Sequence, residues 1–339
     1  PRCSRSSQNK INNMKHLLEI NNLDVKFDTD EGRITAIENV SLSLDQGKVL
    51  GIVGESGSGK SVTAKSIMQL NPGNTTYNDD AEIIIDKENV LKFSSKNDLK
   101  KIRGGKVSMI FQEPMASFAP AIKIGHQMVE QLLLHKSLNK KEAKSISIDM
   151  LNRVGIADAE KRFNQYAFEL SGGMRQRAMI AMALSTMPKL LLADEPTTAL
   201  DVTIQAQVIN LIKDIIKEYN MGVIFITHDL GVIAQVADDV AVMYLGSIVE
   251  KGPVNEILKN PKHPYTKGLL NALPDINNLD APLRPIPGNI PSPLERPSGC
   301  VFRTRCPNPT HECKEGHVEM GLLEVSPGHW VDQCCINCG

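Results

Sequence analysis

Residues 54–61 read GESGSGKS, and this short stretch decides how the rest of the chain is interpreted. It fits the phosphate-loop pattern G-x-x-x-x-G-K-S/T. A compact apolar run, residues 48–53, precedes it, and a stretch of helical character, residues 61–70, follows. The sequence therefore predicts a strand, a phosphate-binding loop and a helix in succession. A plain glycine turn is the alternative.

Each residue type in this loop suits contact with a nucleotide. Glycines let successive backbone N–H groups curl around the β- and γ-phosphates, and the helix N-terminus adds a favourable dipole. Lys60 adds charge, and the Ser61 hydroxyl is a ligand for Mg²⁺. We expect the nucleotide to be bound by Gly54, Ser56, Gly57, Ser58, Gly59, Lys60, Ser61 and Val62.

A second motif, KLLLADEP at residues 189–196, is an apolar strand that ends in two carboxylates. Asp194 is suited to hold Mg²⁺ through its water shell, and Glu195 is suited to polarise the attacking water. A helix cap is the alternative for two adjacent carboxylates at a strand end.

The remaining patterns indicate an α/β fold. Alternating apolar residues in 17–45 predict antiparallel strands. Continuous apolar runs at 190–193 and 223–226 predict parallel strands covered on both faces, joined by a helix on which Val208, Leu211, Ile212, Ile215, Ile216 and Tyr219 recur at helical spacing. Residues 115–170 read as helices. We therefore expect a parallel-sheet core, an antiparallel β-subdomain and a helical subdomain.

Composition limits the possible functions. The chain has 339 residues, 41% hydrophobic and 23% charged, with a formal net charge of −1, which excludes general disorder and a global basic field for nucleic acid. No apolar run approaches the roughly 18 residues of a spanning helix. Residues 1–13 are polar and basic, and we expect them to be a leader or disordered segment without signal-peptide character.

Residues 170–177, LSGGMRQR, resemble the signature motif of ATP-binding-cassette (ABC) ATPases. The resemblance implies that Ser171, Gly172 and Gly173 contact the γ-phosphate of ATP bound to a second subunit, so that two cassettes form a nucleotide sandwich. Without it, this stretch would be interpreted as a flexible helix cap.

Other positions match the same family in order. Gln112 resembles the Q-loop glutamine, Asp201 the D-loop aspartate and His228 the switch histidine. The resemblance implies that Gln112 senses Mg²⁺ and water, that His228 bonds the γ-phosphate, and that both act in catalysis with Glu195. Phe27 occupies the approximate place of the adenine-stacking aromatic, with a core role as the alternative.

Further segments of the sequence resemble the D-type ATPases of oligopeptide and dipeptide importers: DEPTTALDVT at 194–203, NPKHPYT at 260–266 and GCVF at 299–302. This resemblance implies an ATPase domain at 14–252 and an irregular cysteine-rich extension at 253–339. It also implies an F-type ATPase partner, two permease subunits, an extracytoplasmic peptide-binding protein and a place on the cytoplasmic face of the membrane. The alternatives are a cargo of nickel or another small solute, and a soluble ABC ATPase without a permease.

Six of the seven cysteines lie in the last forty residues, and without a secretory signal such a cluster favours metal over disulfides. The resemblance implies a 4Fe-4S cluster on Cys300, Cys306 and Cys313, with Cys334 as fourth ligand and Cys335 as its alternate. The C-x-x-C pair of Cys335 and Cys338 leaves zinc or free thiols open. A redox or metal sensor that governs the ATPase is a further possibility.

Overall fold

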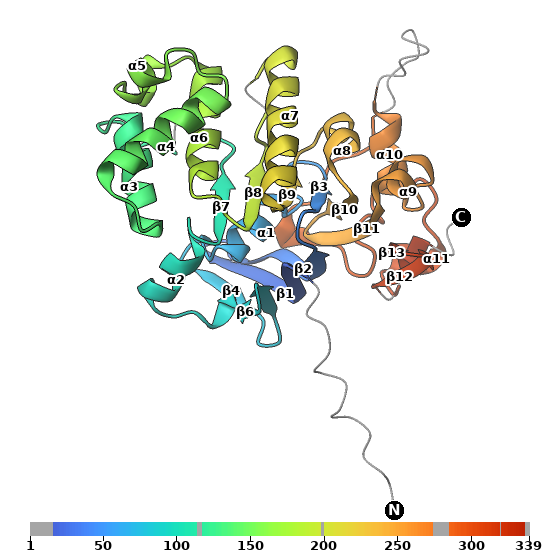
Figure 1. Cartoon of the computed structure of the whole chain (residues 1–339). Coiled ribbons are helices and arrows are strands. Elements are labelled where there is room, and N and C mark those ends of the chain that lie inside the picture. The colour runs from blue at the N-terminus through green and yellow to red at the C-terminus, as the bar shows by residue number, and fades with distance from the viewer. Residues whose placement is uncertain (1–15, 114–116, 198–199, 274–284, 319, 336–339) are drawn as a thin grey trace, which may run out of the picture.

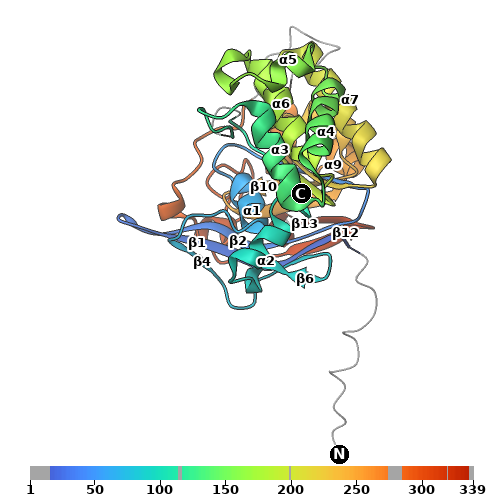
Figure 2. The same ribbon diagram turned by 60° about the vertical axis from the view of Figure 1, so that its left-hand side comes forward.

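Two sheets with helices packed around them make up the computed structural model, which describes residues 16–113, 117–197, 200–273, 285–318 and 320–335. In both views of the molecule the antiparallel sheet forms a layer beneath the helices (Figures 1 and 2). The predicted leader, residues 1–13, lies outside the described residues.

The antiparallel sheet has the strand order β2-β1-β5-β6, with β4 paired to β1. Its long hairpin joins β1 (Leu18–Thr29) to β2 (Gly32–Leu44), and Phe27 pairs with Ile34 next to the turn. The shorter strands are β4 (Thr75–Tyr77), β5 (Glu82–Ile85) and β6 (Glu88–Asn89). Apolar side chains of β1 alternate into the core, which is why the period-2 pattern predicted this layer correctly.

The main sheet has eight strands in the order β12-β13-β11-β10-β3-β9-β8-β7. Its centre is parallel and contains β10 (Asp239–Tyr244), β3 (Val49–Val53), β9 (Gly222–Ile226), β8 (Leu190–Asp194) and β7 (Val107–Ile110). Every residue of β3, β8 and β9 is buried. This burial on both faces explains their continuous apolar sequences and confirms the predicted α/β core.

Helices connect and cover these strands. The helix after β3 is α1 (Lys60–Ile67), α2 (Lys96–Ile102) precedes β7, α7 (Val202–Tyr219) joins β8 to β9, and α8 (Leu230–Val236) joins β9 to β10. Between β7 and β8 the chain forms α3 (Ile124–His135), α4 (Lys140–Arg153), α5 (Ala159–Phe163) and α6 (Gly172–Ser185). These helices gather at the end of the molecule opposite β12 and β13 (Figure 1).

The C-terminal part is joined to the main sheet. Antiparallel β11 (Ser247–Pro253) pairs with β13 (His329–Asp332), which pairs with β12 (Leu322–Ser326). The helices of this part are α9 (Val254–Lys259), α10 (Pro264–Asn271) and α11 (His311–Glu315), with a 3-10 turn at Pro293–Glu295. The sheet thus continues across the predicted boundary at residue 252, and the extension is more regular there than its sequence suggested.

A buried polar contact holds that edge together. Glu250 and His329 are both fully buried, with His329 Nε2 2.8 Å from Glu250 Oε1. The Glu250 carboxylate also accepts hydrogen bonds from the backbone N–H groups of Lys262 and His263, at 2.7 and 3.0 Å. One carboxylate therefore satisfies three donors from two segments of the extension.

Among the described residues, no helix is both long enough and apolar enough to cross a membrane.

Candidate nucleotide and cysteine sites

The phosphate loop lies between β3 and α1, as the motif predicts, and its backbone requires glycine. Gly54, Gly57 and Gly59 have φ values of 154, 80 and 98°, in the region that residues other than glycine rarely adopt. A Cβ at Gly54 would also lie 2.2 Å from the carbonyl oxygen of Met243. The chain therefore uses these glycines to build its own loop.

Lys60 is fixed across this loop by the backbone. Its Nζ donates to the carbonyl oxygens of Gly54 and Glu55, both at 2.8 Å, and to Ser58 Oγ at 3.3 Å. The side chain is nearly buried, and this burial lowers the pKa of Lys60, although the carboxylates of Glu195 and Asp194 act in the opposite direction. The ammonium group is thus held where it faces two acidic side chains.

A cavity of about 250 Å³ opens above the loop. Most of the predicted nucleotide-binding residues line it: Phe27, Ser56, Gly57, Ser58, Gly59, Lys60, Ser61, Val62, Gln112 and Glu195. The cavity is also lined by five residues that no sequence motif indicated: Ile34, Thr35, Ala36, Leu245 and Pro293. Phe27 additionally packs against the core of the antiparallel layer, so both interpretations of this residue have structural support.

Three predicted catalytic residues meet at the carboxyl ends of neighbouring parallel strands. Gln112 follows β7, Glu195 follows β8 and His228 follows β9. Gln112 Nε2 donates to Glu195 Oε2 at 3.1 Å, and His228 Nδ1 lies 3.2 Å from Glu195 Oε1. The carboxylate is therefore held from both sides.

The backbone of Glu195 has φ of 48°, the left-handed region that non-glycine residues rarely occupy. Its N–H donates to the carbonyl oxygen of Ile226 on the adjacent strand at 2.9 Å. Such backbone strain costs about 1–3 kcal/mol and concentrates at functional sites. Here it turns the carboxylate away from the strand and toward the cavity.

Asp194 lies beneath the loop and is 3% exposed. Burial raises its pKa, and a hydrogen bond with Ser61 opposes this shift. Its Oδ1 is buried and has no hydrogen-bond partner among the described residues. An orphaned carboxylate oxygen beside a serine hydroxyl is the ligand set that Mg²⁺ prefers, so these residues fit the predicted metal site.

The signature turn lies apart from this cavity, because Ser171, Gly172, Gly173 and Asp201 are not among its described lining residues. The Ser171 hydroxyl accepts from the N–H of Met174 and caps α6, and Asp201 caps α7 by accepting from Ile204. A Cβ at Gly172 would meet nothing within 4 Å, and one at Gly173 would make only ordinary contact with Leu200 at 3.5 Å. Ala199 of the D-loop pattern lies outside the described residues.

Of the four cysteines predicted to bind metal, Cys300 and Cys334 lie together with His263, whereas Cys306 and Cys313 are not part of this group among the described residues. Ligand atoms of His263, Cys300 and Cys334 all lie within 4.8 Å of one another, and all three residues are buried. A hydrogen bond with Cys334, together with burial, raises the pKa of the Cys300 thiol. Burial raises the pKa of the Cys306 thiol, and the nearby thiols of Cys300 and Cys313 raise it further.

Cys335 Sγ lies 3.5 Å from Cys334 Sγ, but Cys334 is the one grouped with Cys300. Cys338 of the C-x-x-C pair lies outside the described residues.

The ring of His263, which had no predicted role, lies beside the sulfurs of Cys300 and Cys334. Burial lowers its pKa to about 3, so the ring is neutral. Its Nδ1 accepts from the N–H of Tyr265 at 3.0 Å, which places the single ring proton on Nε2. That Nε2 is buried without a hydrogen-bond partner among the described residues. The ring therefore carries an N–H donor that is unpaired among the described residues, while its lone-pair nitrogen is occupied by Tyr265.

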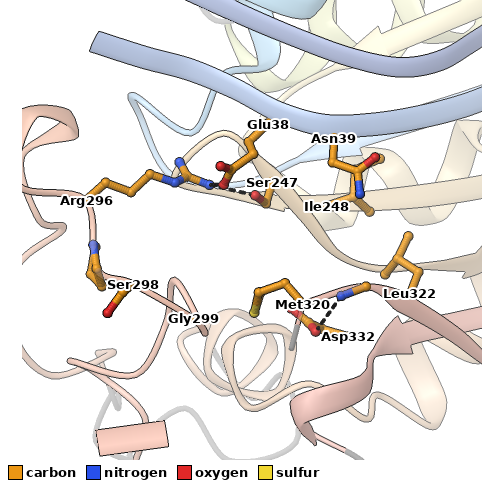
Figure 3. A pocket seen from close by; sticks show the side chains of 12 residues that line it. Glu38, Asn39, Ser247, Ile248, Arg296, Ser298, Gly299, Met320, Leu322 and Asp332 are labelled. Carbon is orange, nitrogen blue, oxygen red and sulfur yellow. Dashed lines mark hydrogen bonds and ion pairs between the residues drawn. The ribbon is translucent and has the colours of Figure 1, made fainter. Parts of the chain in front are cut away.

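A larger cavity of about 550 Å³ separates the extension from β2 and β11 (Figure 3). On one side Arg296 contacts Glu38 at 2.6 Å and Ser247 Oγ at 2.8 Å. On the other side lies Asp332, whose pKa burial raises to about 6, with the N–H of Gly321 3.4 Å away. Arg296 thus fastens the extension to the ATPase strands.

Both the phosphate-loop cassette and the C-terminal region of this chain match families of known proteins. Residues 37–198 match the ABC transporter family, and residues 249–313 match the C-terminal region of oligopeptide/dipeptide transporters. The oligopeptide transport ATP-binding protein OppD of Bacillus subtilis (strain 168) is 49% identical over 317 residues, 93% of this chain and 87% of that protein. The dipeptide transport ATP-binding protein DppD of the same organism is 46% identical over 327 residues, 96% and 95% of the two chains.

Among solved structures, a dimeric ATP-binding cassette, MJ0796, in a post-hydrolysis state bound to ADP and Pi, superposes with a TM-score of 0.64 and 26% sequence identity. The match covers 70% of this chain and 98% of that chain. The part of this chain that such a cassette does not cover is therefore similar in length to the C-terminal extension.

Proposed function

Because the chain belongs to the family of oligopeptide and dipeptide transport ATP-binding proteins, we propose that it is the subunit whose ATP hydrolysis powers an importer for dipeptides or oligopeptides. The observation that carries this proposal is the Glu195 carboxylate, held by Gln112 and His228 at the mouth of the phosphate-loop cavity. Relatives transport peptides, which favours a peptide cargo over nickel or another small solute.

The phosphate loop and Lys60 bind the phosphates of ATP, and Glu195 accepts the proton of the attacking water. Gln112 and His228 keep the two oxygens of Glu195 in place, so the base is aimed before ATP arrives. Ser61 and Asp194, with Gln112, are the residues that would hold Mg²⁺, which neutralises charge on the phosphate oxygens.

The site is half of a pair in this proposal. Ser171, Gly172 and Gly173 contact the γ-phosphate on a second cassette, and an F-type ATPase is the partner that the family resemblance favours. The open space at Gly172 supports this, because the fold of this chain does not itself require glycine there. The closing and opening of the two cassettes then drives two permease subunits from the cytoplasmic face of the membrane, supplied by an extracytoplasmic peptide-binding protein.

Replacement of Glu195 by Gln tests the proposed base. We expect turnover to fall by roughly 10²- to 10⁴-fold, the usual contribution of a general base, while ATP binding is kept. The measurements are phosphate release and equilibrium ATP binding on the same preparation. Normal hydrolysis by Glu195→Gln would refute the assignment.

The cargo is tested by reconstitution with two permease subunits and a peptide-binding protein of an oligopeptide importer. We expect labelled di- or oligopeptides to stimulate ATP hydrolysis and to accumulate inside vesicles. Stimulation by Ni²⁺ and not by peptides would assign the chain to metal import, and hydrolysis unaffected by the permease would favour a soluble ATPase.

The cysteine site is the second part of the proposal: Cys300, Cys306, Cys313 and Cys334 hold a 4Fe-4S cluster. Buried thiols from separated segments, with the ligand atoms of Cys300 and Cys334 close together, support a shared metal site. The tautomer of His263 favours a role as donor to sulfur over a role as zinc ligand.

Anaerobic purification with iron, sulfide and zinc analysis tests the cluster. We expect a brown protein with about four irons per chain, and loss of iron and colour in Cys300→Ser. A colourless protein with one zinc, or with no metal, would overturn the proposed cluster and leave the ATPase assignment untouched.

A further inference from the structure

Glu55, the second residue of the phosphate loop, is held at three separate groups. Its carboxylate accepts from Arg305 Nη1 at 2.7 Å and from Arg305 Nη2 at 3.3 Å. Its backbone N–H donates to the hydroxyl of Tyr265 at 2.8 Å, and its carbonyl oxygen accepts from Lys60 Nζ at 2.8 Å. Two of these partners belong to the C-terminal extension, some 210 and 250 residues away in sequence.

The extension holds both partners rigidly. The Arg305 side chain is only 3% exposed, and it also donates to the carbonyl oxygens of Pro287 at 3.0 Å and Ile286 at 3.3 Å. Its guanidinium lies 5.8 Å from the ring centroid of Tyr244 on β10. A fork fixed at several nitrogens can present its remaining donors to a carboxylate in one geometry only.

Tyr265 is fully buried in an aromatic cluster. Its ring packs edge-on against Tyr244, with centroids 4.7 Å apart, and lies 5.4 Å from Phe302. Tyr265 follows His263 by two residues, and Arg305 directly precedes Cys306. The residues that touch the loop are therefore neighbours of the cysteine site in sequence.

We propose that Arg305 and Tyr265 are positioning residues for the phosphate loop, and that they set the affinity of this chain for ATP. They act through Glu55, whose carbonyl oxygen is one of the two backbone acceptors that hold Lys60. When Glu55 shifts, Lys60 loses this acceptor and the phosphate cradle widens. The inference rests on the proposed binding of ATP at this loop.

This chain of contacts reaches Lys60 in the phosphate loop but does not include the base Glu195. Glu195 is held by Gln112 and His228, which come from the ends of other strands. Loss of Arg305 should therefore weaken ATP binding, while turnover at saturating ATP changes far less. A general defect in folding would not produce this separation.

The test measures MgATP affinity by equilibrium titration of the full chain, with melting temperature recorded for each variant. We expect Arg305→Gln and Glu55→Gln each to weaken binding roughly 5- to 20-fold, in the lower range of coupling between sites. The double variant should be no weaker than either single variant, because one interaction is removed in all three. Arg305→Lys should be intermediate, since a lysine replaces the bidentate fork with one point charge.

Arg303→Gln is the matched control. Arg303 lies in the same segment and donates to the carbonyl oxygens of Cys313 and Lys314 within the extension. We expect it to bind ATP like the parent chain. If Arg305→Gln fails to fold, Glu55→Gln tests the same pair from the loop side, where the side chain is 31% exposed.

Two results separate the possible failures. Parent-like ATP affinity in both Glu55→Gln and Tyr265→Phe would overturn this inference. Absence of ATP binding in the parent chain itself would overturn the proposed function instead.

Discussion

The chain contains two glycine turns that we propose to contact phosphate, and they differ in why glycine is present. In the phosphate loop, Gly54 has φ of 154° and no room for a Cβ, because Met243 O lies 2.2 Å from where it would be. In the signature turn, Gly172 has open space around its missing Cβ and opens an ordinary helix. The fold of this chain therefore requires glycine in the first turn, at Gly54, but not in the second, at Gly172.

This difference fits the proposal that the first turn binds a phosphate within this chain and the second a phosphate bound to a partner. A strained loop that curls around Lys60 forms a site within one chain. A helix N-terminus with two glycines and an exposed face suits close approach by a group from outside. The comparison thus gives physical support to a dimeric site, independently of the resemblance that first suggested it.

Gly54→Ala should have the largest effect. Overpacking and backbone strain together should lower the free energy of unfolding by roughly 2–4 kcal/mol. ATP affinity should fall by at least about 100-fold, equivalent to some 2.7 kcal/mol. Denaturant melts and ATP titration check both effects. Gly73→Ala is the control, because a Cβ there meets nothing within 4 Å; equal behaviour of the two variants would break the comparison.

Gly172→Ala should separate binding from hydrolysis. Alanine fits the space and the helical backbone, so stability should stay equal or rise by about 0.4–1 kcal/mol. ATP binding to the isolated chain should not change. Hydrolysis by the assembled pair should fall about 100-fold, because the added Cβ would hold the developing charge away from the backbone N–H donors, at about the cost of losing one such donor. Parent-like hydrolysis in the presence of the partner cassette would show that nothing approaches this turn.

Local patterns predicted the strands, the phosphate loop and the two carboxylates of the ATPase part, and the family resemblance supplied Gln112 and His228. The buried strands β3, β8 and β9 are continuous apolar runs, and the motif residues at their ends meet because parallel strands share one carboxyl edge. The contact of Glu195 with both Gln112 and His228 follows from that topology. The fold class and most of the cavity lining were therefore predictable.

The contacts of the extension were not predictable in the same way. Strand β13 buries His329 against Glu250, a polar pair that hydrophobic periodicity cannot detect. In β12, Leu323 and Val325 are exposed, so its apolar residues do not mark a core face. The pairing of Arg305 with Glu55 joins residues 250 positions apart. Side-chain contacts over such distances depend on the assembled fold, which no local pattern encodes.

Phe27→Ala should have a moderate effect on ATP affinity, and it tests whether this residue binds the adenine or belongs only to the core. Stacking of a base on an aromatic ring contributes about 1–3 kcal/mol, and Phe27 shares its ring with the core. We therefore expect ATP affinity to fall roughly 5-fold, near the lower limit of that contribution. Phe27→Tyr keeps the ring and is the control. If Phe27→Ala lowers stability but leaves ATP affinity intact, the residue belongs to the core alone.

Asp201 should give the smallest effect, and it tests whether a residue of the signature side has a function beyond its own helix. The side chain caps α7 through the N–H of Ile204 at 2.9 Å, so Asp201→Ala should cost about 1 kcal/mol of stability. Asp201→Asn keeps an equally good cap, and its thermal stability should match the parent chain. If the Asp201 carboxylate also acts across the dimer, Asp201→Asn should lower hydrolysis a few-fold although its stability is unchanged. Parent-like hydrolysis in Asp201→Asn would mean that Asp201 only caps α7. The glycines of the signature turn would then be the remaining structural support for a site completed by a partner.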